Sequence, residues 1–183
     1  MIVLAGASAS GKTEVAKMLA KKYGITKMIT TTTRDLRVGE QNGKDYFFVS
    51  KTEFEQMLRK DKFVEHTIYN GNFYGSTKDQ IAPNRCVVVD PAGLRAYIAL
   101  NDTSIITFYL DSTEETRHKR MIARGDLPEK IASRLAHDKE AFDPANLPEV
   151  DFHVDSENNH VEEVADVIYD IYTKEMAKRY QSK

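Results

Sequence analysis

The segment GASASGKT, from Gly6 to Thr13, constrains the fold of this chain more than any other part of its sequence. It follows a short apolar run, MIVLA, which indicates a buried strand, and it precedes TEVAKMLAKKYG, which has the apolar spacing of a helix. The segment matches G-x-x-x-x-G-K-[ST], a phosphate-binding loop that joins a strand to a helix in α/β proteins. We therefore expect an α/β fold with an anion site where this helix begins.

We predict that the loop binds a nucleoside triphosphate, because its backbone N–H groups and the helix N-terminus would face the phosphates. Lys12 would reach the β- and γ-phosphates, and Thr13 would ligate Mg²⁺. The alternative is a loop that only turns the chain. The predicted nucleotide-binding residues are Gly6, Ala7, Ser8, Ala9, Ser10, Gly11, Lys12 and Thr13.

The rest of the chain continues this alternation of strands and helices. CVVVD, SIITFYL and DFHVD indicate further strands, and a helical pattern follows each of them. FVEHTIY and NFYG flank Asn70-Gly71, a hairpin signal, so the middle of the chain is expected to be antiparallel. A short helix, TEFEQMLRK, has Thr52 and Glu55 in capping-box spacing. The whole pattern predicts one domain, a parallel sheet flanked by helices and interrupted by a small β-rich insert.

Composition limits the classes of function. The 183 residues suffice for one sizeable domain, and 26 basic against 28 acidic side chains give a net charge of −2, so a broad nucleic-acid surface is not expected. No apolar run is long enough to span a membrane, and the single cysteine, Cys86, suits a reducing cytoplasm. The five histidines lack zinc-site spacing. We expect a cytoplasmic monomer or homodimer that binds small molecules.

The stretch TTTTRDLRVGEQNGKDYFF, which starts at Thr30, is a second candidate binding segment. Arg34 and Arg37 carry planar guanidinium groups suited to phosphate, although a polar surface loop is the alternative. If Lys12 and Thr13 hold a donor triphosphate, the two arginines could hold an acceptor phosphate. The oxygen of such an acceptor is already an anionic nucleophile, so the reaction needs no general base.

Charged residues at two further places suit the same reaction. Asp90 ends the strand CVVVD, where a carboxylate can hold a metal ion through its water shell or cap the next helix. A row of arginines on the helix STEETRHKRMIAR, followed by one arginine on the next helix, indicates either a mobile phosphate-neutralising lid or a solvated face paired with glutamates. The arginines are Arg117, Arg120, Arg124 and Arg134, and the glutamates are Glu114 and Glu115.

The order and spacing of these motifs resemble those of guanylate kinases. The resemblance rests on GASASGKT, TTTTRDLRVGEQNGKDYFFVS, FVEH, YNGNFYGS, VVVD with Gly93 after it, RMIARG and IASRL, and it covers about Ile2 to Ile171. It implies an ATP:GMP phosphotransferase of purine nucleotide metabolism that uses ATP and Mg²⁺ and accepts GMP or dGMP. It also implies a P-loop kinase core (residues 1–30, 84–116 and 145–183), a GMP-binding insert (31–83) and a short helical lid (117–144).

The resemblance assigns roles to single residues. It implies that the GMP phosphate is bound by Arg34, Arg37, Tyr46 and Tyr74, and that guanine is bound by Thr30, Glu65 and Ser76. It implies that Asp90 contributes to the substrate site and to the metal site. The catalytic residues that it implies are Lys12, Arg34 and the lid arginines Arg120, Arg124 and Arg134. A carboxylate can accept hydrogen bonds from both N1–H and the exocyclic amine of guanine. Adenine offers no such donor pair, so a base-reading glutamate would select guanine.

Three positions depart from the family pattern. Val88 stands where an acidic residue is usual, Pro91-Ala92-Gly93 replaces apolar-Gln-Gly, and Glu14 replaces a hydroxyl residue and is expected to repel a bound triphosphate. Two alternatives follow: a divergent kinase with another acceptor, or a guanylate-kinase-like binding module without catalysis. Such modules generally lack an intact Gly-Lys-Ser/Thr, which this chain retains, and this favours the kinase.

We predict that Glu65→Gln lowers the preference for guanine over adenine, because an amide presents one acceptor oxygen and turns a donor toward the donors of guanine. The measurement is the ratio of kcat/KM for GMP over AMP. An unchanged ratio would mean that Glu65 does not read the base.

Overall fold

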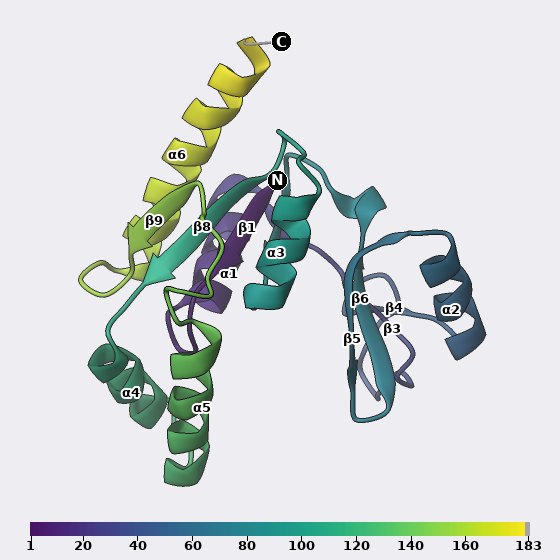
Figure 1. The fold of residues 1–183 in the computed structure, drawn as a ribbon, viewed down its shortest axis with the longest axis horizontal. Coiled ribbons are helices and arrows are strands. Elements are labelled where there is room, and N and C mark those ends of the chain that lie inside the picture. Colours follow the sequence, from purple (N-terminus) through teal and green to yellow (C-terminus); the bar gives the residue numbers. More distant parts are fainter. Residues whose placement is uncertain (182–183) are drawn as a thin grey trace.

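The computed structural model describes residues 1–181. Its core is a five-stranded parallel sheet in the order β2-β7-β1-β8-β9, with helices on both faces (Figure 1). The strands are β1 (Ile2–Ala5), β2 (Thr26–Lys27), β7 (Arg85–Val88), β8 (Ile106–Asp111) and β9 (Phe152–Asp155). The predicted α/β class with a parallel sheet is confirmed.

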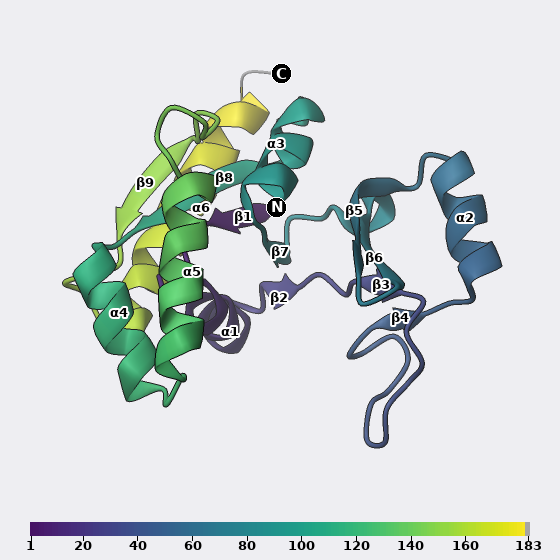
Figure 2. The same ribbon diagram turned by 60° about the horizontal axis from the view of Figure 1, so that its bottom comes forward.

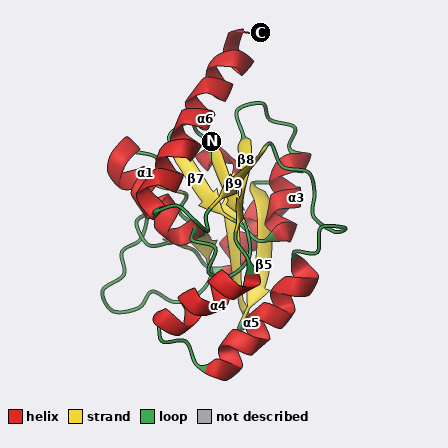
Figure 3. Ribbon diagram, turned by 90° about the vertical axis from the view of Figure 1, so that its left-hand side faces the viewer, coloured by secondary structure: helices red, strands yellow, loops and turns green. Residues whose placement is uncertain are grey.

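The two faces of β1 belong to two different hydrophobic clusters. Ile2 and Leu4 pack with residues of α1 (Lys12–Tyr23) and α6 (Val161–Gln181), while Val3 and Ala5 pack with residues of α3 (Pro91–Ala99). All four side chains are fully buried. A parallel sheet needs such cover on both faces, and this explains why its strands are apolar runs without alternation. Figure 3 shows the sheet enclosed between these helices, with the C-terminal part of α6 projecting beyond it.

A second sheet forms the insert, in the order β4-β3-β6-β5. Its elements are β3 (Thr31–Thr32), β4 (Phe47–Phe48), α2 (Lys51–Arg59), β5 (Phe63–Tyr69), β6 (Asn72–Thr77) and a 3₁₀ turn, η1 (Lys78–Gln80). Asn70 (φ 48°) and Gly71 (φ 75°) are both left-handed, as a two-residue hairpin turn requires, so the predicted hairpin is confirmed. The predicted antiparallel arrangement is wrong for β4, which pairs with β3 in parallel.

Two helices, α4 (Glu114–Ala123) and α5 (Pro128–Ala141), extend from the carboxyl end of β8 and pack against each other. They lie on the opposite side of the core from the insert (Figures 1 and 2). The core therefore stands between two projecting parts, one before β7 and one after β8. Among residues 1–181, no helix is long and apolar enough to cross a membrane.

The N-terminus of α2 differs from the prediction. Thr52 and Glu55 were expected to form a capping box, but the residues that form it are Ser50 and Glu53. Ser50 Oγ accepts from the Glu53 N–H at 3.2 Å, and Glu53 Oε2 accepts from the Ser50 N–H at 2.8 Å. The capping-box spacing occurs twice with a two-residue offset, as S-x-x-E from Ser50 and as T-x-x-E from Thr52, and the extended backbone at Ser50 selects the first.

We predict that Ser50→Ala lowers the free energy of unfolding by about 0.5–2 kcal/mol, because the Glu53 N–H loses the side-chain oxygen that accepts its hydrogen bond. Thr52→Ala is the matched control and should change it by less than about 0.5 kcal/mol. Urea unfolding followed by circular dichroism measures both. A larger loss in the Thr52 variant would place the cap where the sequence first suggested it.

Candidate nucleotide-binding site

The loop between β1 and α1 has the conformation of a phosphate cradle. Ala9 (φ 62°) and Gly11 (φ 97°) are left-handed, which turns successive N–H groups toward one side of the loop. A Cβ at Gly6 (φ 145°) would lie 2.8 Å from Ser10 Oγ and 2.9 Å from the carbonyl oxygen of Leu110. Glycine is therefore required at position 6, where the loop passes close to β8.

The Lys12 ammonium lies within this loop. Its Nζ donates to the carbonyl oxygens of Gly6 (2.6 Å) and Ala7 (2.8 Å) and to Ser10 Oγ (3.4 Å). Burial lowers the pKa of Lys12 to about 8, an effect opposed by the nearby negative charge of Asp138. An anion in the loop would exchange the carbonyl contacts for charged ones and favour the protonated amine.

A cavity of about 330 Å³ opens beside the loop. It brings together predicted residues of the loop with the predicted lid residues Arg120 and Arg124. The Arg120 guanidinium donates to the carbonyl oxygens of Ala9 (3.3 Å) and Ser156. Four residues after β9 also line this cavity and were not predicted, although they follow a parallel strand and so lie at the same edge of the sheet. These are Ser156, Asn159, Val161 and Val164.

The other predicted lid arginines have different partners. Arg124 Nε and Arg134 Nη1 both donate to Asp126, at 3.1 and 2.9 Å. Arg117 is buried and pairs with Asp138, while Glu115 pairs with Lys119, so the solvated face predicted as an alternative is wrong at Arg117. Arg120 is thus the lid arginine that already contacts the loop.

The predicted acceptor segment gathers around Arg34. This guanidinium pairs with Glu40 Oε1 at 2.7 Å, lies over the ring of Tyr46 at 5.3 Å, and interacts with Tyr74. Its side chain is only 13% exposed. The N–H of Arg37 donates to the second oxygen of Glu40 at 2.9 Å. The structure therefore brings these predicted residues together, and it adds Glu40, whose pKa is held low mainly by Arg34.

A second cavity, of about 490 Å³, lies between β5 and the start of α3. Glu65 and Asp90 line it together with Val88, one of the three departures from the family pattern. Ser76 is buried and faces Glu65 across the β5–β6 pairing. Tyr97, which the sequence analysis did not single out, interacts with Ser76 and Glu65 from α3, and burial raises its pKa.

Thr30 and Asp90, two further predicted site residues, have backbone or helix-capping contacts in the structure. The backbone carbonyl of Thr30 accepts from Phe47 N at 3.0 Å, which joins the start of the insert to β4. Asp90 Oδ1 accepts from the Gly93 N–H at 2.8 Å, so its predicted helix-capping role is confirmed. Asp90 lines the second cavity and Thr13 lines the first, so the structure does not bring the two predicted metal ligands into one cavity.

Glu14 has a cationic partner that the sequence analysis did not name. Its carboxylate lies 2.8 Å from Lys17 Nζ, one turn further along α1, and both side chains are exposed. Lys17 and solvent offset the charge of Glu14 at the cavity rim. The expected repulsion of a triphosphate by Glu14 is correspondingly reduced.

These features define a P-loop nucleotide-binding protein with a cluster of arginine and tyrosine side chains on an insert. Comparison with known proteins narrows the class. The model of the guanylate kinase family matches residues 1–175. The chain belongs to the guanylate kinase family.

Individual relatives agree with this assignment. A guanylate kinase of Dechloromonas aromatica is 38% identical in an alignment 144 positions long that covers 74% of this chain and 71% of the relative. One of Anaplasma phagocytophilum is 31% identical in an alignment 188 positions long that covers 97% of this chain and 88% of the relative. A crystal structure of guanylate kinase from Anaplasma phagocytophilum is similar with a TM-score of 0.59 and 26% identity, covering 96% of this chain and 85% of that one.

We predict that Arg34→Ala and Arg37→Ala weaken binding of GMP and leave binding of ATP unchanged. Losing a charge-assisted contact typically costs about 1.5–3 kcal/mol, or roughly 10- to 150-fold in affinity. Lys44→Ala, which removes an exposed charge from the same segment, is the control. Calorimetric titration with each nucleotide decides the point, and a loss confined to ATP contradicts the assignment.

Proposed function

We propose that the protein transfers the γ-phosphoryl group of ATP to GMP or dGMP, giving ADP and GDP or dGDP. The observation that carries this proposal is the placement of basic groups on two separate parts of the chain. One is the loop around Lys12 at the carboxyl end of β1, and the other is the cluster of Arg34, Tyr46 and Tyr74 on the insert. Membership in the guanylate kinase family supports the same reaction.

The donor side is assigned to the loop and the cavity beside it. The N–H groups of the loop would bind the β- and γ-phosphates, and Lys12 would leave the carbonyls of Gly6 and Ala7 to contact them. The apolar side chains Val161 and Val164, with the polar Asn159, suit the adenine ring at the far end of the cavity.

The acceptor side is assigned to the insert. Arg34 and Arg37, with the hydroxyls of Tyr46 and Tyr74, would bind the phosphate of GMP. Glu65 would accept from guanine, with Thr30 and Ser76 at the same site. Since Glu40 now holds Arg34 at 2.7 Å, the incoming phosphate must share or replace that carboxylate.

The chemical step needs positioning and charge. An oxygen of the acceptor phosphate forms a bond to the γ-phosphorus of ATP, while the bond from that phosphorus to the β–γ bridging oxygen breaks and ADP leaves with the electron pair. Lys12 and the lid arginines Arg120, Arg124 and Arg134 would stabilise the charge on the transferring group. No residue has to remove a proton from the acceptor.

The two sites lie in different cavities, and the lid and insert flank the core on opposite sides (Figure 2). We therefore propose that the insert, residues 31–83, and the lid, residues 117–144, move toward each other when both nucleotides are bound. Closure would exclude water and place acceptor and donor in line.

Magnesium is a further part of the proposal. Among residues 1–181, no group of three or more His, Cys, Asp and Glu could hold a metal ion, which suits Mg²⁺ bound mainly by nucleotide phosphates and water. The Thr13 hydroxyl fits one ligand position beside the loop, and Asp90, already a helix cap, fits a role through water. When bound, Mg²⁺ would neutralise charge on the donor phosphates. A cytoplasmic location, suggested by the lone Cys86, also belongs to this proposal.

We predict that GMP and dGMP support ADP release from ATP and Mg²⁺, whereas AMP, CMP and UMP support it at least about 100-fold less well, since a carboxylate left unpaired is costly. A coupled ADP-release assay with this panel is the test. Lys12→Ala should keep the circular dichroism spectrum of the parent and abolish turnover. Near-normal turnover in that folded variant would remove the loop from the mechanism.

A further inference from the structure

A buried carboxylate from the lid contacts the tip of the phosphate-binding loop. Asp138, on α5, accepts from the backbone N–H of Ser8 (2.8 Å, Oδ2) and from Ser8 Oγ (3.1 Å, Oδ1). The same Oδ2 accepts from Arg117 Nη1 on α4 at 2.8 Å. Asp138 and Arg117 are 4% and 7% exposed. We call these three residues the Ser8–Arg117–Asp138 junction.

The junction is too costly to be incidental to folding. A charged pair shielded from water loses hydration free energy, and apolar residues of similar volume fill such places at no greater cost. The pair is also incompletely satisfied, because Arg117 Nε has no hydrogen-bond partner in the part of the chain that the structure describes. Net stability is therefore a weak explanation for this pair, and its contact with the loop is a stronger one.

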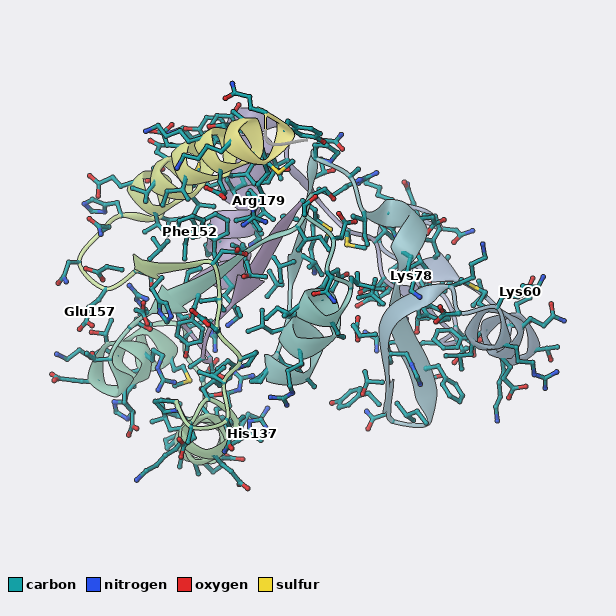
Figure 4. All side chains as sticks on the ribbon, turned by 45° about the horizontal axis from the view of Figure 1, so that its top comes forward. Lys60, Lys78, His137, Phe152, Glu157 and Arg179 are labelled. Atoms are coloured by element: carbon teal, nitrogen blue, oxygen red, sulfur yellow. The ribbon has the colours of Figure 1, made fainter. Side chains whose placement is uncertain are left out.

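The junction connects the three parts that must act together on a triphosphate. Through Asp138 it joins α5 to the loop at Ser8, and through Arg117 it joins α4 to the same point. Arg120 of α4 reaches the adjacent loop residue, Ala9, at 3.3 Å. Figure 4 shows His137, the neighbour of Asp138 on α5, and Glu157, whose carboxylate binds Thr113 and Thr116 at the start of α4. Both helices of the lid thus have a side chain that donates to or accepts from the loop.

We infer that Asp138 is a positioning residue for the donor nucleotide, which holds the tip of the phosphate-binding loop and docks the lid on it. Arg117 supplies the charge that makes the buried carboxylate tolerable. This role rests on the proposed function, since it assigns the loop to ATP. It acts on the donor side alone, because the junction touches no residue of the insert.

A variant that keeps the stability of the protein but lacks the contact between Asp138 and Ser8 distinguishes a positioning role from a purely structural one. Arg117→Leu/Asp138→Ala replaces the charged pair with apolar side chains, so no buried charge is left without a partner. Asp138→Asn keeps an oxygen that can accept from the Ser8 N–H. Glu140→Ala removes an exposed carboxylate from the same helix and is the control.

We predict that the double variant has a melting temperature close to that of the parent and a KM for ATP raised about tenfold, with the KM for GMP within about twofold. Asp138→Asn should raise the KM for ATP less, and Glu140→Ala should change neither constant. Amide hydrogen exchange at Ser8 in the nucleotide-free protein should be faster in the double variant. Parental KM for ATP together with parental exchange at Ser8 would overturn the inference.

Another measurement decides the role of Asp138 if the double variant does not fold or if the parent is inactive. If the double variant does not fold, Arg117→Met/Asp138→Leu decides, because it also leaves no buried charge and removes the acceptor for Ser8. A raised KM for ATP with an unchanged KM for GMP supports the role, and no change in either overturns it. If the parent releases no ADP with any monophosphate, the proposed function fails. The junction is then tested by calorimetric ATP binding and Ser8 exchange, where equal values in parent and double variant would contradict it.

Discussion

The rest of the structure depends on one constraint, which is that the phosphate of GMP and the triphosphate of ATP, both negatively charged, must lie in line with each other. The chain has a net charge of −2, so positive charge must be concentrated where the phosphates meet. Several cations assigned to that place already have partners in the protein: Lys12 has loop carbonyls, Arg34 has Glu40, and two lid arginines share Asp126. In the proposed reaction, nucleotide binding would therefore be an exchange of partners, in which a contact with the ligand replaces a contact within the protein.

The fold supplies the geometry for this exchange. Parallel strands end at one edge of the sheet, where the loop after β1, the cap of α3 after β7 and the helices after β8 all begin. The insert carries the proposed acceptor residues on a separate sheet, and α4 and α5 carry Arg120, Arg124 and Arg134. In the proposed reaction, the bound nucleotides would supply the attraction that brings insert and lid together.

Local signals in the sequence predicted much of this arrangement, but contacts between residues that lie far apart in the sequence could not be predicted. The loop, the Asn70-Gly71 turn and the buried strands depend on neighbouring residues, so spacing was sufficient. Glu40 and Asp138 act through contacts that form only in the folded chain, and no spacing in the sequence predicts these contacts. Lys17 lies three residues after Glu14, so that pair could have been recognised from helix periodicity.

The central claim is that the two cavities are halves of one reaction site. The most direct test is calorimetric titration with adenosine and guanosine joined through their 5′-oxygens by a chain of phosphates long enough to occupy both anion sites. The account predicts one ligand per protein, bound more tightly than ATP or GMP alone, with the gain lost in both Lys12→Ala and Arg34→Ala. Binding no tighter than that of the better mononucleotide, or a gain that survives either substitution, would contradict it.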